Sequence, residues 1–344
     1  MASSVLDVVS APASAIGRYF SVLSVVPSSL VVVYVFGLVN AAPWRGRPDW
    51  QAAGEAFGEL GFGGGLALGL VGLLIGLVLQ PLQYAAVQFC EGYWGPGPLA
   101  QAVMARRILH HRKRRGGLVE FQGESLHRLR QAKQSPTEED ADWVDDDHLA
   151  DLVAFEESSR LLTFYPRHRN DVRPTRLGNV LRRHERTAGA AYDLPGVSVA
   201  PHLTLVAPAA DVAYLSDQRT QLDLAVRLST LSAIATVITA LMFWRSGLWL
   251  ALALAPYAAT YLFYRGAVSL AQGYGTALTT LVDLNRFALH DRMRIEAPRD
   301  TRAERDANRA IGRLLRDAQA QDLPLAPPPV AAGGQNSPVL PGPG

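Results

Sequence analysis

The densest cluster of charge in the sequence is a run of six basic residues within ten positions. The run consists of Arg106, Arg107, Arg112, Lys113, Arg114 and Arg115. Guanidinium and ammonium groups pair with phosphates and carboxylates, and each basic residue near an anionic membrane surface contributes about 1 kcal/mol of attraction. The run therefore predicts contact with anionic headgroups of membrane lipids, or with an unidentified protein partner. It is also typical of an anchor that fixes membrane topology, and both roles can hold together.

A second group of arginines lies between residues 173 and 186. Pro174 and Thr175 are typical of a helix start. The apolar side of that helix, at the spacing i, i+3, i+4 and i+7, consists of Leu177, Val180, Leu181 and His184. Four arginines, including Arg186, fall outside this side, and we predict that three of them also contact lipid or a partner: Arg176, Arg182 and Arg183. Gly178 would weaken the helix unless a close neighbour needs the space that a side chain would occupy.

The other reactive residues form no recognisable catalytic or metal site. The sequence contains no phosphate-binding loop, nucleophile elbow, HExxH or CxxC motif, and its histidines share no metal-ligand spacing. Cys90 is the only cysteine, which excludes an intramolecular disulfide. We expect Cys90 to be buried or to lie at an interface; acylation of its thiol is the alternative. We therefore predict that the protein is not an enzyme and binds no cofactor or metal.

Eight carboxylates lie between residues 138 and 151. They could attract a divalent cation, but the central glycine and final glutamate of a calcium-binding loop are missing. A solvated acidic linker is the favoured interpretation. The net charge of +2 is too balanced to indicate a nucleic-acid partner.

The elements that position these residues follow from the apolar composition. Hydrophobic residues make up 49% of the chain and charged residues 19%, and the apolar residues concentrate in four segments. We predict membrane-spanning helices at 22–42, 60–80 (with an alternative end near 94), 226–244 and 247–264. Each has the length that a bilayer core requires, and a chain in lipid must satisfy its backbone internally. A cleaved signal peptide is the alternative for the first segment.

The predicted fold class is therefore an all-α polytopic membrane protein, with two N-terminal spans, a C-terminal helical hairpin and a mostly helical cytoplasmic middle region. Because arginines concentrate after the second and fourth spans, the positive-inside rule predicts that both termini are cytoplasmic. The remaining predicted segments are a cytoplasmic N-terminal segment (1–21), an external loop (43–59), the cytoplasmic middle (95–222), cytoplasmic amphipathic helices (265–320) and a disordered Pro/Gly-rich tail (321–344).

Five glycines form one stripe on the second predicted span: Gly61, Gly65, Gly69, Gly72 and Gly76. Small residues at this spacing let another helix approach closely. The partner is another helix of the same chain, or a second copy in a homo-oligomer. The middle of each span lacks Asp, Glu, Lys and His, which argues against a proton-coupled transporter but is compatible with a passive channel.

Several segments resemble an uncharacterised family of bacterial multipass membrane proteins. They are Pro174-Thr175-Arg176-Leu177-Gly178-Asn179 with Leu181 and Glu185, Tyr192-Asp193, Pro201-His202-Leu203, Tyr274-Gly275 and the stretch 282–289. The resemblance covers roughly residues 160–310 and implies a bacterial plasma membrane protein. Where the family has tryptophan before Pro201, this chain has Ala200, so the resemblance implies no aromatic anchor there. It carries over no catalytic residue.

The leading hypothesis is a non-enzymatic scaffold or interaction protein of the membrane, whose basic cytoplasmic region contacts lipid headgroups or a protein. The alternative is an oligomeric channel or pore. A membrane-embedded enzyme would need polar groups to converge, for example around Asn179 and Glu185.

Overall fold

The computed structural model describes residues 26–41, 47–134, 146–317 and 325. Helices make up most of this part of the chain, whose only β-type contact is an isolated bridge between Ile295 and Leu325. The predicted all-α class is therefore confirmed for the described residues. The predicted segment 1–21, most of the 321–344 tail and residues 138–145 of the acidic stretch lie outside the described residues.

The first apolar segment contains helix α3 (Val26–Asn40). Its 15 residues measure about 22 Å at 1.5 Å per residue, which is less than the bilayer core of about 30 Å. Residues 22–25 and 42 of the predicted span lie outside the described part of the chain. A complete crossing by this segment is therefore not confirmed.

The predicted external loop contains a second helix, α4 (Trp50–Glu59). One carboxylate oxygen of Asp49 accepts hydrogen bonds from the backbone N–H groups of Gln51 and Ala52 at 3.1 and 3.0 Å. This N-cap satisfies donors that have no partner within the helix. The segment is thus largely helical and leads directly into the next apolar helix.

Helix α5 (Gly61–Leu79) matches the predicted span at 60–80, and a break separates it from α6 (Leu82–Glu91). Pro81 has no N–H to continue the helical hydrogen bonds. The N–H of Gln80 donates to the Leu77 carbonyl at 3.2 Å, so the Gly76 carbonyl loses its usual partner. The guanidinium of Arg227, which is buried, donates to that carbonyl at 2.9 Å. Arg227 therefore stabilises the break between α5 and α6.

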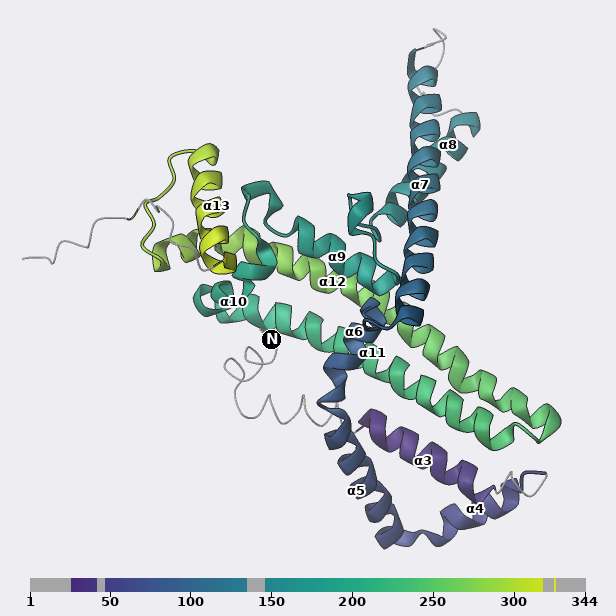
Figure 1. The fold of residues 1–344 in the computed structure, drawn as a ribbon. Coiled ribbons are helices and arrows are strands. Elements are labelled where there is room, and N and C mark those ends of the chain that lie inside the picture. Colours follow the sequence, from purple (N-terminus) through teal and green to yellow (C-terminus); the bar gives the residue numbers. More distant parts are fainter. Residues whose placement is uncertain (1–25, 42–46, 135–145, 318–324, 326–344) are drawn as a thin grey trace, which may run out of the picture.

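A long helical hairpin forms the centre of the molecule (Figure 1). It consists of α11 (Ala209–Phe243), the 3₁₀ helix η5 (Gly247–Ala253) and α12 (Leu254–Arg292). Residues 244–246 form the turn of this hairpin, and the spans predicted at 226–244 and 247–264 mark only the apolar halves beside it. Each helix continues without interruption into a charged half, so α11 and α12 are about 52 and 58 Å long.

Among the described residues, three helical stretches are long and apolar enough to cross a membrane: Gly61–Leu79, Ala209–Phe243 and Gly247–Arg292. They support the prediction of a transmembrane protein. They also expose large apolar side chains such as Phe62, Leu70, Leu241 and Leu262, as helices that face lipid do.

Helices α3 and α5 pack against each other on one side of α11 and diverge toward α4, and α3 also contacts α11 (Figure 1). The Tyr34 hydroxyl of α3 lies 2.8 Å from the Thr239 hydroxyl of α11. The Trp50 ring of α4 stacks on Phe243 and also contacts Trp249, with ring centroids 6.4 and 5.9 Å apart. The connection between α3 and α5 thus lies at the same end of the molecule as the hairpin turn.

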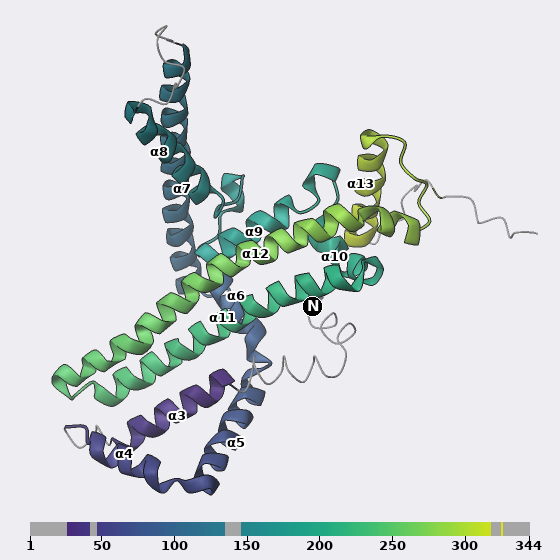
Figure 2. The same ribbon diagram turned by 180° about the vertical axis from the view of Figure 1, so that it is seen from behind.

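Two helices form an arm that stands away from the hairpin in both views (Figure 1, Figure 2). They are α7 (Pro98–Gln134) and α8 (Asp146–Leu162), which pack against each other. The Arg128 side chain of α7 pairs with Asp151 of α8 at 2.7 Å. Helix α8 begins at Asp146, so the last residues of the acidic stretch are helical.

The charged half of the hairpin is covered by α9 (Arg176–Thr187), α10 (Gly196–Val206) and α13 (Thr301–Asp317), with short 3₁₀ helices at Arg169–Asp171 (η3) and Ala190–Tyr192 (η4). One core joins the apolar side of α9, including Leu177 and Val180, to α6, α11 and α12. A second core joins α10, the end of α12 and α13 around Leu203 and Ile311. This part of the chain is therefore a packed helical layer beyond the apolar half.

Candidate functional site

Two members of the basic run hold the loop between α8 and α9. The Arg112 guanidinium donates to the Arg169 carbonyl at 3.1 Å, and the Arg115 guanidinium donates to the Pro166 carbonyl at 3.0 Å and to the Arg167 carbonyl. Hydrogen bonds from a charged donor are stronger than those between neutral groups. Arg112 and Arg115 therefore have a structural role in attaching this loop to the arm.

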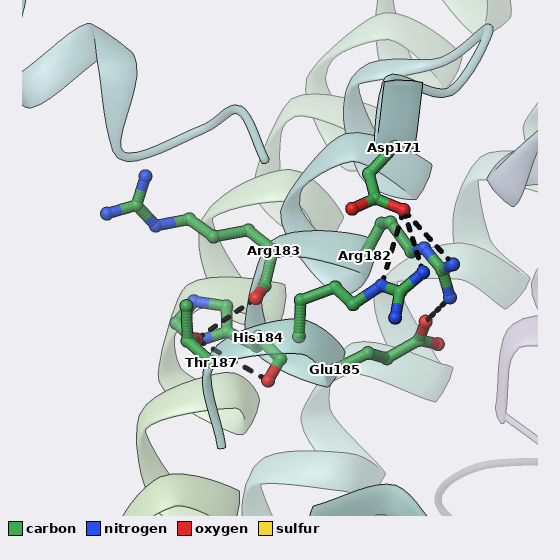
Figure 3. Close-up of polar contacts among 7 residues, drawn as sticks. Asp171, Arg182, Arg183, His184, Glu185 and Thr187 are labelled. Carbon is green, nitrogen blue, oxygen red and sulfur yellow. Dashed lines mark hydrogen bonds and ion pairs between the residues drawn. The ribbon is translucent and has the colours of Figure 1, made fainter. Parts of the chain in front are cut away.

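Arg182 and Arg183 of α9 also make internal contacts, which differ in kind (Figure 3). Arg182 pairs with Asp171 at 3.2 Å and with Glu185 at 3.1 Å. Arg183 points away from Asp171 and donates to the carbonyls of Leu162 and Tyr165 at 2.9 and 3.0 Å. Both arginines thus connect α9 to neighbouring segments.

The ion pairs around Asp171 include a third partner, Arg186, at 3.1 Å. Burial opposes ionisation of Asp171, but the hydrogen bonds and charges of Arg186 and Arg182 outweigh it and hold the pKa of this carboxyl below its ordinary value. The arginines of this cluster are therefore neutralised within the protein and are poorly suited to hold an external anion.

Three of the remaining predicted arginines converge on a cavity of about 420 Å³ where the arm meets the hairpin. Five arginines from four helices line it: Arg107 and Arg114 of α7, Arg160 of α8, Arg176 of α9 and Arg265 of α12. The rest of the lining is aromatic, apolar or hydroxyl-bearing, and includes Phe164, Tyr165, Tyr261 and Tyr264. We call this site the arginine cavity.

The lining of the arginine cavity contains no carboxylate. Among the described residues, Arg160 is the only one of the five arginines that forms an ion pair, with Glu157 at 2.6 Å on the exposed side of α8. The Arg265 guanidinium lies 5.8 Å from the Tyr261 ring centre. Five positive charges thus surround one cavity with a single carboxylate partner between them, an arrangement that favours a bound anion.

One residue of the lining, Tyr165, forms a buried pair with His111. The Nδ1 atom of His111 lies 3.1 Å from the Tyr165 hydroxyl. Burial, and then the charges on Arg107, His110, Arg176 and Arg114, lower the pKa of His111 to about 4. His111 is therefore neutral at physiological pH, and the cavity carries its positive charge on arginines alone.

The start of α9 adds oriented backbone dipoles to the same site. Thr175 caps this helix by accepting the Gly178 N–H at 3.0 Å, and the next donor, the Leu177 N–H, points at the Tyr264 hydroxyl at 3.4 Å. Tyr264 lines the cavity. Because a helix N-terminus carries partial positive charge, the start of α9 adds to the positive potential of the arginines.

The cavity has the groups of a binding site. Arginine forks and tyrosine hydroxyls can hold phosphate or carboxylate oxygens, but the lining has no nucleophile paired with a base. The part of the chain that the structure describes contains no group of three or more His, Cys, Asp or Glu side chains arranged to hold a metal. Asn179 and Glu185 do not reach the cavity: Asn179 bonds the Arg173 and Thr175 carbonyls inside the fold.

The predicted arginines thus divide into three groups. Arg107, Arg114 and Arg176 line the cavity, whereas Arg112, Arg115, Arg182 and Arg183 hold internal segments together. Arg106 and Lys113 are exposed on α7 outside the lining. The sequence interpretation did not single out Arg160 and Arg265. The position of Arg265 directly after the last apolar segment is the signal that could have identified it.

The glycine stripe of α5 consists of one half that packs against the rest of the chain and one half that does not. A side chain at Gly72 would collide with Ser29 of α3, and the Gly76 carbonyl accepts the Arg227 hydrogen bond. A Cβ atom at Gly61, Gly65 or Gly69 would meet nothing within 4 Å. Packing within the chain therefore accounts for the second half of the stripe and leaves the first half open.

No protein-family model, curated protein or solved structure matches this chain. The class of protein is therefore defined by the structure itself. Over the residues that the structure describes, it is a helical protein with three helices long and apolar enough to cross a membrane and an arginine-lined cavity at the edge of its apolar half.

Proposed function

We propose that this is a non-enzymatic scaffold or interaction protein of the bacterial plasma membrane, which holds the headgroup of an anionic lipid in the arginine cavity. The observation that carries the proposal is the convergence of five arginines, without a carboxylate in the lining, on one cavity. The bacterial assignment rests on the family resemblance described above.

The position of the cavity along α12, at the end of the apolar segment, supports a headgroup ligand. Tyr261 and Tyr264 are the last tyrosines of the apolar segment, and Arg265 directly follows Tyr264. Tyrosines and arginines at the end of a span occupy the headgroup region of a bilayer. The cavity then lies at the level of the phosphates on the cytoplasmic side.

We further propose four crossings, with both termini in the cytoplasm. The contacts of Trp50 with Phe243 and Trp249 support a common side for α4 and the hairpin turn. Trp244, Trp249 and Trp50 then form the aromatic belt of the external surface. The arm, α9 and α13 lie on the opposite, cytoplasmic side, where the basic residues are most frequent.

The test compares two double variants of the full-length protein purified in uncharged detergent. Arg107→Gln with Arg176→Gln removes two charges from the cavity, whereas Arg106→Gln with Lys113→Gln removes two exposed charges outside it. At about 1 kcal/mol for each basic residue, the first pair should weaken binding of phosphatidylglycerol about 30-fold. Native mass spectrometry counts the bound lipid. Equal binding by both variants and the parent protein would refute the proposal.

A second candidate is an oligomeric channel, favoured by the open half of the glycine stripe. If Gly65 and Gly69 form a contact between copies, then Gly65→Leu with Gly69→Leu should dissociate the oligomer in mass photometry. Gly116→Leu with Gly117→Leu on α7 is the control, because these glycines also have open space but lie outside the apolar helices. A monomeric parent protein would rule out this candidate.

A further inference from the structure

One face of α12 connects the hairpin turn to the arginine cavity. Leu254, Tyr257 and Tyr261 follow at intervals of three and four residues, and Arg265 is the next residue on the same face. The exposed fractions of the three apolar side chains are 64%, 60% and 52%. Residues at this spacing lie above one another along a helix. An exposed apolar stripe therefore ends inside the cavity, because Tyr261 and Arg265 both line it.

The charges of the lining discriminate between headgroups. A zwitterionic headgroup carries an ammonium group, which would find five guanidinium groups and no carboxylate in the lining. A phosphodiester such as phosphatidylglycerol brings one negative charge, whereas a phosphomonoester brings about −1.5 to −2 at pH 7 together with three acceptor oxygens. The lining favours the phosphomonoester, because more of its guanidinium donors find a charged acceptor.

We propose that the ligand is a phosphatidic-acid-type lipid, with its phosphomonoester in the arginine cavity and an acyl chain along the stripe formed by Leu254, Tyr257 and Tyr261. This inference rests on the proposed function and adds the class of lipid and the path of its chain. The acyl chain covers an apolar surface that leads to the charged site. It also brings the phosphate to the end of the span, where the arginines are.

A free phosphate ester shares the headgroup chemistry but cannot use the stripe. Binding assays on the full-length protein in uncharged detergent can therefore separate the two sources. The probes are dioleoyl phosphatidic acid, dioleoyl phosphatidylglycerol and glycerol 3-phosphate. We expect at least tenfold tighter binding of phosphatidic acid than of phosphatidylglycerol, and still weaker binding of glycerol 3-phosphate.

The stripe is tested with Tyr257→Ser, and Val237→Ser on α11 is the control. These side chains are similarly exposed, at 60% and 58%, and neither lines the cavity. Loss of apolar contact with the acyl chain should weaken phosphatidic acid binding by Tyr257→Ser about five- to tenfold. The same variant should bind glycerol 3-phosphate like the parent protein, and Val237→Ser should bind both probes normally.

The outcomes separate this inference from the proposed function. Equal affinity for phosphatidic acid and phosphatidylglycerol would overturn the assignment of the headgroup. Equal affinity for glycerol 3-phosphate and phosphatidic acid, or identical behaviour of Tyr257→Ser and Val237→Ser, would overturn the acyl-chain path. Both results leave anion binding in the cavity intact. Absence of binding for every probe would refute the proposed function itself.

Discussion

Gly178 is a position where the structure predicts a clear effect of a single methyl group. It lies in α9, where this helix crosses the end of α6. A Cβ atom at Gly178 would lie 2.1 Å from the Glu91 carbonyl oxygen and 3.0 Å from its carbon. Both are backbone atoms, so the neighbour cannot avoid the methyl group by a rotamer change. Gly178→Ala therefore requires that α6 and α9 move apart.

The expected magnitude follows from two opposing terms. Replacement of a helical glycine by alanine stabilises an exposed helix by up to about 1 kcal/mol, whereas overpacking of a tight contact costs about 1–3 kcal/mol. Because the contact at Gly178 is with backbone, we take the upper end of that range. The net loss in free energy of unfolding is then about 2 kcal/mol.

Gly117 provides the matched control. It is also a helical glycine, in α7, but a Cβ atom there would meet nothing within 4 Å. Gly117→Ala should benefit from the higher helix propensity of alanine without any steric cost, and so stabilise the arm by up to about 1 kcal/mol. The two substitutions are chemically identical, so the difference between them isolates the contact with Glu91.

The assay is thermal unfolding of the detergent-solubilised protein, followed by tryptophan fluorescence at one scan rate. We expect the midpoint of Gly178→Ala to fall by several degrees and that of Gly117→Ala to stay level or rise. If Gly178→Ala unfolds at or above the temperature of the parent protein, α6 does not approach α9 as described. The packing that positions Arg176 at the cavity would then also be wrong.

Two further predictions concern titration of the charged region. Because the pKa of His111 is about 4 in the folded protein, against about 6.5 in an unfolded chain, the unfolded state binds a proton first as pH falls. Stability should therefore be full above about pH 6.5 and fall by about 2 kcal/mol between pH 7 and 5; a His111→Gln variant that retained the same slope in pH-dependent melting would contradict this. Asp171, whose pKa is lowered by Arg186 and Arg182 against the effect of burial, should stabilise the fold at neutral pH and lose this effect as pH falls below the ordinary carboxyl range. Asp171→Asn should cost about 1 kcal/mol at pH 7, and the gap to the parent protein in the same melting assay should close in acid.

The local features of α9 could be predicted from the sequence. Pro174 and Thr175 marked the start of the helix, and the apolar spacing identified its buried side, which includes Leu177 and Val180. The need for space at Gly178 was also predictable, because a glycine inside a helix is costly without a close neighbour. The identity of that neighbour, the Glu91 carbonyl, was not, because it comes from a helix more than 80 positions earlier.

The ends of the long helices were harder to predict. An apolar run identifies the part of a helix that suits lipid, but a helix does not end where its residues become charged. Residues 209–225 of α11 and 265–292 of α12 continue the same helices with charged and polar residues among the apolar ones. Helix α4 was missed because its mixed composition lacks an apolar run, although Asp49 is a typical N-cap.

The arginine cavity depends on three-dimensional contacts that spacing cannot reveal. Arg107 and Arg114 lie seven residues apart on α7, and periodicity places them on the same side. Arg160, Arg176 and Arg265 reach the cavity from three other helices. In contrast, Arg112, Arg182 and Arg183 had the same signature in the sequence and were found to bond carbonyls or carboxylates of the fold. Charge density alone does not distinguish a structural arginine from one that is available for a ligand.

The unbroken length of α11 and α12 has a mechanical consequence. A helix without a hinge acts as a stiff lever, so tilting of its apolar half must displace its charged half. Spans adjust their tilt when bilayer thickness changes, and a rotation of roughly 10° would move a point 30 Å along the axis by about 5 Å. Helices α9, α10 and α13 pack on the charged halves of α11 and α12 and would move with them. In the proposed orientation, a change in bilayer thickness would therefore displace the helices on the cytoplasmic side of the protein.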